Sequence, residues 1–320
     1  MKTRLAFILA VGLALHLSWL TVWCQEEEKT FDLRNQFHSG QTVYLDLKTT
    51  TQGVATTKTS SKPAQTPINS ELESVISYKT AGIGADQQAL IEIAFHRMMM
   101  SGEMLGGTTQ DLLDNLGLTE KIIRLKASPK GKIEEAAGEA DKRGGLNDSA
   151  QSFTRQLPYL QFPDQPVALG AQWKESRRVP YSTAAKPLIA YTTYELDKVI
   201  EENGENIAVI KTDMHIHETD IPIDSSSQTG DLTNVIIKFT YKEFTMAGRG
   251  EIRFSLDKGR VLSAQNTQNV TIHMEGSTDI NKSSFLQDVV QSYVQQSLAT
   301  FSEESPLTKD ESTDESKHPN

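Results

Sequence analysis

Two histidines separated by one residue, His215 and His217, are the side chains whose type and spacing best suit a metal site in this sequence. Residues i and i+2 of a β-strand point to the same face, so both imidazoles could bind one zinc or copper ion. A complete site needs a third ligand, which His96 or His273 could supply if the fold brought it there. The alternative is a pair of structural histidines at a polar strand end. We favour this alternative, and we expect no metal and no other cofactor.

The rest of the chain contains no recognisable catalytic centre. It has no Gly-x-Ser-x-Gly turn, no His-Glu-x-x-His helix and no glycine-rich loop in a context that could hold phosphate. The single cysteine is Cys24, so a chain that begins at Gln25 has no thiol for a disulfide bond, a metal site or a nucleophile. No pair of carboxylates stands out for acid–base chemistry. We therefore expect that the protein is not an enzyme.

The N-terminus predicts export. Lys2 and Arg4 precede an almost wholly apolar run over residues 5–23, which is typical of a secretory signal segment. Cleavage after Cys24 is the favoured interpretation. Lipid attachment at Cys24 and an uncleaved anchor of about 19 apolar residues are the alternatives, although bulky Trp23 is a poor match to a lipid-attachment signal. All three place the protein in the periplasm, in the envelope or outside the cell.

The charge and composition of the chain limit the classes of partner that we expect it to bind. The net charge of −10 argues against nucleic-acid binding, which needs a basic face to neutralise phosphates. The hydrophobic fraction of 37% is typical of β-proteins that leave one strand face in water. Contact with a membrane is expected only through the N-terminal segment, if that segment is retained or lipidated.

Alternating apolar and polar residues predict a β-rich body. Residues 42–48 alternate strictly, with Val43, Leu45 and Leu47 on one face. Hairpin turns are predicted where a Gly follows a polar residue between two such runs. The other predicted strands are Leu90–Phe95, Tyr191–Val199, Ile207–Ile216, Val235–Met246, Glu251–Leu256 and Asn269–Met274.

The two halves of the chain carry similar segments in the same order. The run Ile123-Arg124-Leu125 before the turn Lys130-Gly131 parallels Ile252-Arg253-Phe254 before Lys258-Gly259. Tyr78 parallels Tyr194 farther upstream, and Gly40–Val43 parallels Gly170–Trp173. These matches predict an internal duplication, in which Leu125 and Phe254 are buried at matching positions.

Helices are expected in few places. Ser284 and Gln287 form a capping box, and apolar residues at helical spacing follow them as far as Phe301. Shorter helices are predicted at Thr109–Leu116 and Ser149–Leu157. The predicted organisation is a signal segment (1–24), a first β-rich half (25–157), a proline-bounded linker (158–169), a second β-rich half (170–282), an amphipathic helix (283–301) and a disordered acidic tail (302–320).

The linker carries a resemblance to a known family. Pro163-Asp164-Gln165-Pro166-Val167, followed by Gly170 and Trp173, resembles the Pro-Asp-x-Pro-Val-x-x-Gly-x-x-Trp signature of an uncharacterised family of exported bacterial proteins. The resemblance covers residues 31–276. It implies export and a β-rich fold, and it transfers no catalytic residues.

We predict a mainly β fold (β-rich α+β) of two similar curved antiparallel sheets, or half-open barrels, with short covering helices. By fold analogy alone, such sheets resemble the half-barrels with which bacterial lipoprotein carriers hold acyl chains. The leading functional prediction is a non-enzymatic envelope binding module for a lipid, another apolar ligand or an envelope protein. The alternatives are a structural or adhesive envelope scaffold with a filled core, and an enzyme of unrecognised type. A lined pocket of several hundred cubic ångströms would favour binding over a scaffold.

Overall fold

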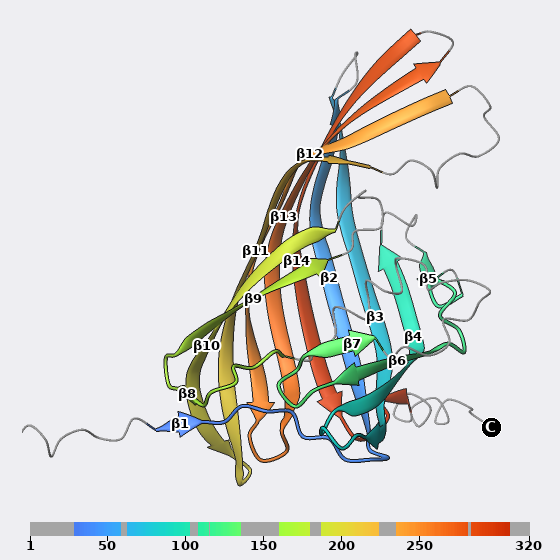
Figure 1. Cartoon of the computed structure of the whole chain (residues 1–320). Helices are drawn as coiled ribbons and strands as arrows, with labels where there is room; N and C mark the ends of the chain where they lie inside the picture. Colours follow the sequence, from blue (N-terminus) through green and yellow to red (C-terminus); the bar gives the residue numbers. More distant parts are fainter. Residues whose placement is uncertain are drawn as a thin grey trace, which may run out of the picture.

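The computed structural model describes residues 29–58, 63–102, 108–114, 116–135, 160–179, 187–223, 235–280 and 283–307. The elements within these residues are strands (Figure 1). The short ones are β1 (Thr30–Phe31), β5 (Thr109–Asp111), β6 (Ile122–Ala127), β7 (Ile133–Glu135), β8 (Val167–Ala168) and β9 (Gln172–Val179). The long ones are β2 (Thr42–Lys58), β3 (Pro63–Ile83), β4 (Ala89–Gly102), β10 (Leu188–Glu202), β11 (Glu205–Pro222), β12 (Val235–Ser255), β13 (Arg260–Ile280) and β14 (Ser283–Ser302). The described residues contain no helix long and apolar enough to cross a membrane.

Twelve strands form one antiparallel sheet, in the order β7-β6-β4-β3-β2-β14-β13-β12-β11-β10-β9, with β5 paired to β4. Strands β1 and β8 form a separate pair. The predicted mainly β, antiparallel class is therefore confirmed. The prediction of two separate sheets is wrong, because β14 pairs with β13 on one side and β2 on the other and so joins the halves. Figure 1 shows the result as a single, strongly curved layer.

The predicted helix at residues 283–301 is a strand in the structure. Side chains of residues 291–300 alternate between half-buried and exposed, which is the period of a strand. Tyr293 and Phe301 are eight residues apart, a spacing that nearly fits a helix face and fits a strand face fully. Hydrogen bonding on both sides, to β13 and β2, stabilises the strand over the local helical preference.

The shorter helix predicted at 109–116 is not found either. Residues 109–111 form β5 on the edge of β4, and a turn follows in which the backbone N of Leu113 donates to Asp111 Oδ1 at 2.9 Å. An Asp side chain that bonds to the backbone two residues on favours a turn over a helix. The predicted helix at 149–157 lies outside the described residues, as do the signal segment and the tail beyond residue 307.

Several contacts are matched between the two halves of the chain. The backbone N of Gly40 donates to Thr80 O at 2.8 Å, and that of Gly170 donates to Leu196 O at 2.7 Å. A register shift in the β-ladder follows each acceptor residue. These four residues therefore hold similar places at the start of each half.

The hairpins of the predicted repeat do not match as expected. Leu125 and Phe254 are both buried, with exposed fractions of 3% and 0%. The pair nearest the turn is Ser255 with Arg260 in one hairpin and Ala127 with Ile133 in the other. Phe254 thus lies one residue before its closing pair and Leu125 lies two residues before its own, so the two positions do not correspond residue for residue, and the duplication itself stays a prediction.

Successive side chains along each strand point to opposite sides, so the sheet has two faces. We call the face that carries Leu45, Phe254 and Phe301 the inner face and the opposite one the outer face. The larger apolar core lies on the inner face at the lower end of the sheet, where the β10–β11 and β12–β13 turns also lie (Figure 1). A smaller core that includes Phe244 and Ile272 lies farther along the same strands.

Two glycines permit a close approach of strands between these cores. Gly248 and Gly250 lie two residues apart on the inner face of β12. A Cβ on Gly248 would lie 2.7 Å from Gln268 Cγ, and one on Gly250 would lie 2.9 Å from Thr212 Oγ1. Side chains at these positions would force the neighbouring strands apart, so the glycines are required where the sheet is tightly packed.

The chain before β2 crosses the lower end of the sheet as an N-terminal strap, residues 30–41. The backbone N of Asn35 donates to Pro129 O at 2.7 Å, and that of Gln36 donates to Gly259 O at 2.8 Å. Within the strap, Leu33 is almost fully buried in the larger core. The strap therefore closes the lower end of the inner face.

Residues 160–173, which include the family signature, lie against the same strap, since Val167 is the register partner of Phe31. Leu160 and Phe162 are buried in the larger core, where Phe162 meets Phe254 edge to face at 4.9 Å between ring centroids. Trp173 stacks on Tyr194 with 5.4 Å between ring centroids and packs against the larger core.

Candidate functional site

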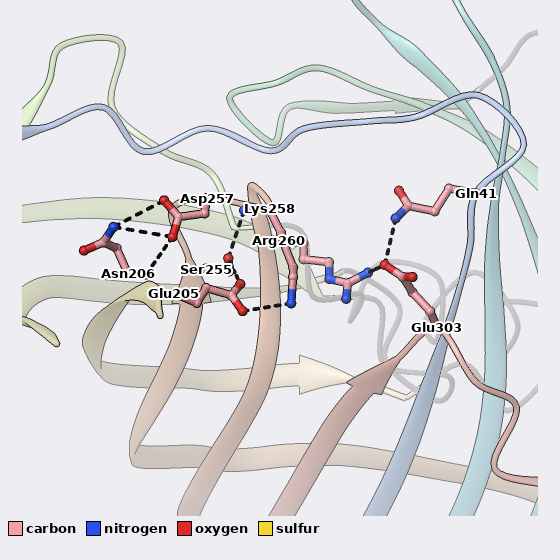
Figure 2. Close-up of polar contacts among 8 residues, drawn as sticks. All are labelled: Gln41, Glu205, Asn206, Ser255, Asp257, Lys258, Arg260 and Glu303. Carbon is pink, nitrogen blue, oxygen red and sulfur yellow. Dashed lines mark hydrogen bonds and ion pairs between the residues drawn. The ribbon is translucent and has the colours of Figure 1, made fainter. Parts of the chain in front are cut away.

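A polar network joins the two turns at the lower end of the sheet (Figure 2). The backbone N of Asn206, in β11, donates to Asp257 Oδ2 at 2.7 Å. Lys258 Nζ pairs with Glu205 Oε2 at 2.8 Å, and the Ser255 hydroxyl donates to the same carboxylate. The hydrogen bond from Lys258, followed by that from Ser255, lowers the pKa of Glu205 below its ordinary value. The network fixes the turn that carries Gly259.

A second polar group lies beside this turn, where Arg260 at the start of β13 pairs with the carboxylate of Glu303. Gln41 Nε2, from the strap, donates to Glu303 Oε1 at 3.1 Å. The bond from Arg260 lowers the pKa of Glu303. The Arg260 side chain is only 18% exposed, and within the described residues its Nε atom is buried without a hydrogen-bond partner.

Arg260 also lines a cavity of about 70 Å³ between the strap and the sheet, which we call the rim cavity. The residues around it are Asn35, Gln36, Phe37, Gln41, Val43, Tyr78, Thr80, Gly259, Arg260, Val261 and Phe301. The lining thus combines aromatic and branched apolar side chains with one guanidinium group and a few amide and hydroxyl groups. This combination suits a small apolar molecule with an acidic group, because a guanidinium pairs well with a carboxylate.

The histidines singled out from the sequence lie on the outer face of β11. His215 stacks on Tyr191 with 5.4 Å between ring centroids, and His217 is exposed. His96 Nε2 instead contacts Ser77 Oγ at 2.8 Å, and His273 Nε2 contacts Asp288 Oδ1 at 2.8 Å. Among the described residues, no three His, Cys, Asp or Glu side chains gather as a metal site would require. Cys24 lies outside those residues.

The inner face of β9 and β10 carries a buried polar cluster that the sequence analysis missed. Tyr194 donates its hydroxyl to Glu175 Oε2 at 3.1 Å, and Arg177 pairs with the same carboxylate. Burial raises the pKa of Tyr194 to about 12, so this phenol is neutral at physiological pH. The signal was present, since Glu175 and Arg177 share a face with Trp173 by strand alternation. Within the described residues, the charges of Glu175 and Arg177 thus neutralise each other.

The similarities of this chain to known proteins are weak. No protein-family model matches the chain, and no curated protein does. Among solved structures, the chain is similar to the outer membrane protein OprG from Pseudomonas aeruginosa, with 8% identity over 84% of this chain and 99% of that one, at a TM-score of 0.26. It is also similar to a DUF1329 family protein from Desulfovibrio piger, with 10% identity over 82% and 84% of the two chains, at a TM-score of 0.14. Similarities at these TM-scores carry no argument about fold or function.

Proposed function

We propose that this chain is an exported, non-enzymatic binding protein, and that the rim cavity holds an apolar ligand with a small acidic group. The observation that carries the proposal is Arg260, which lines a mostly apolar cavity and whose buried Nε atom lacks a hydrogen-bond partner within the described residues. A buried donor without a partner costs about 1–3 kcal/mol, and more when it is charged. An acidic ligand group that accepts a bond from Arg260 recovers this energy.

The size of the cavity limits the ligand. At about 70 Å³ the rim cavity is smaller than the apolar cavity of about 150 Å³ that accommodates benzene in an engineered protein. A carboxylate with a short carbon chain fits this space. A longer acyl chain requires the strap to move. Backbone bonds at Asn35 and Gln36 hold the strap to the hairpin turns, and so does Lys130, whose Nζ donates to Leu33 O at 3.0 Å.

A series of straight-chain carboxylates, from acetate to decanoate, tests the proposal by isothermal titration calorimetry. Each buried CH₂ adds about 0.8 kcal/mol, so the affinity should rise about fourfold per carbon until the cavity is full. Native mass spectrometry of protein purified from its own host, with lipid extraction, should find a bound molecule of the same class. An affinity that does not change with chain length contradicts the proposal.

The alternative is an envelope scaffold with a filled core, and the small volume of the rim cavity favours it. The core side chains Phe244 and Phe254 have exposed fractions of 1% and 0%, so the described interior is well packed around them. A scaffold should show no saturable binding of any carboxylate. The titration series therefore separates the two functions.

A further inference from the structure

A broad depression of about 750 Å³ lies across five neighbouring strands, β2, β14, β13, β12 and β11. Most of the side chains that line it belong to the outer face, so it is separate from the rim cavity. They form two rows of register partners across the strands. One row is Thr50, Gln296, Thr267 and Arg249, and the other is Lys48, Leu298, Gln265, Glu251 and Lys211.

The positive charges in this depression are already neutralised. Lys48 pairs with Glu73 at 3.4 Å and also with Glu71. Lys211 pairs with Asp197 at 2.5 Å, and Arg249 Nε pairs with Asp213 at 3.2 Å. A polyanion would have to displace these carboxylates on a protein whose net charge is −10, so the depression favours an uncharged ligand.

The uncharged side chains between the ion pairs are free to bind a ligand. Gln265, Thr267 and Gln296 are exposed, and within the described part of the chain their side chains form no hydrogen bond. Amide and hydroxyl groups both donate and accept hydrogen bonds. They match a ligand whose surface repeats hydroxyl groups, each of which is also a donor and an acceptor.

An aromatic surface lies in the next row of the same face. Tyr191 is 49% exposed and is the register partner of His215, on which its ring stacks. The neighbour of His215 on β12 is Ala247, which leaves the ring pair uncovered from that side. Flat rings of this kind pack against the C–H faces of sugars, and five strands at about 4.8 Å spacing span roughly 19 Å, room for several pyranose rings.

We propose that this outer-face depression binds a neutral oligosaccharide. Hydroxyl groups of the sugar pair with Gln265, Gln296 and Thr267, and one pyranose ring packs on the exposed Tyr191–His215 ring pair. The proposal does not depend on the function of the rim cavity, because the two sites use opposite faces of the sheet.

The test is titration of the full mature chain with four neutral hexasaccharides (cello-, malto-, xylo- and chitohexaose) and with dextran sulfate, followed by calorimetry and NMR. At least one hexasaccharide should bind and shift the amide signals of Gln265 and Gln296, and dextran sulfate should not bind. The double variant Gln265→Ala/Gln296→Ala should bind about tenfold more weakly, since it removes two hydrogen-bonding side chains. Gln110→Ala, an exposed glutamine on β5, is the matched control and should bind as the parent does.

Three outcomes overturn the proposal. They are binding of none of the four sugars at millimolar concentration, equal binding by the double variant and the parent, and binding of dextran sulfate in preference to every neutral sugar. Tyr191→Ala gives a second measure that does not touch the hydrogen-bonding rows, and it should also weaken sugar binding. Far-UV circular dichroism and the melting temperature of each variant, compared with those of the parent, show that it is folded.

Discussion

Replacing Gly259 by alanine should loosen the N-terminal strap. Gly259 has φ +57, and a left-handed backbone costs an ordinary residue about 1–2 kcal/mol. A Cβ at this position would lie 2.6 Å from the backbone N of Gln36, so the strap must also shift and weaken its 2.8 Å bond to Gly259 O. Loss of that bond adds about 1 kcal/mol. We expect Gly259→Ala to lower the free energy of unfolding by about 2–3 kcal/mol.

Gly204→Ala is the matched control, because Gly204 has φ +78 and open space where a Cβ would lie. Its free energy of unfolding should fall only by the cost of the left-handed backbone, about 1–2 kcal/mol. Urea denaturation measures both losses, and hydrogen exchange measures protection of the Gln36 amide, which should fall in Gly259→Ala alone. Equal losses in the two variants, with the Gln36 amide still protected in both, would refute the role assigned to this contact.

Three further outcomes follow from the described contacts. Truncating Phe254 to alanine should cost about 3–5 kcal/mol and Leu125 to alanine about 2–5 kcal/mol, measured by chemical denaturation, because both are buried in the larger core. Burial lowers the pKa of His96, so the unfolded state takes up a proton first and stability should fall as pH drops below about 6.5. His96→Gln should flatten that part of the pH–stability curve, and an unchanged curve would count against it. Zn²⁺ should leave the melting temperature unaltered; a rise that His217→Ala abolishes would instead reveal a metal site.

Strand alternation made most of the sheet predictable. Val43, Leu45 and Leu47 mark the inner face of β2 directly, because one face of an antiparallel strand is dry and the other wet. Side chains alternate in β14 as well, but there Tyr293 and Phe301 also fit helical spacing. The capping box favoured a helix, and only the pairing with β13 and β2 decides otherwise.

The rim cavity could not be predicted from local patterns. It joins Phe37 of the strap to Arg260 and Phe301, residues that lie far apart in the sequence. Neither a motif nor a spacing marks such a site, since its chemistry arises only when the strap closes over the sheet. The outer-face depression is equally non-local, because its rows are made by register across five strands.

The most direct test of the binding proposal is carboxylate titration of two arginine variants side by side. Arg260→Met removes the guanidinium that lines the rim cavity, and Arg253→Met removes one at the same end of the sheet that pairs with Glu202 and lies outside that lining. Calorimetry with butanoate, whose short chain suits the cavity, should show saturable binding to the parent and to Arg253→Met, and at least tenfold weaker binding to Arg260→Met, as expected when a charged hydrogen bond is lost. Equal butanoate affinity in all three proteins, or binding to none of them, would contradict the account.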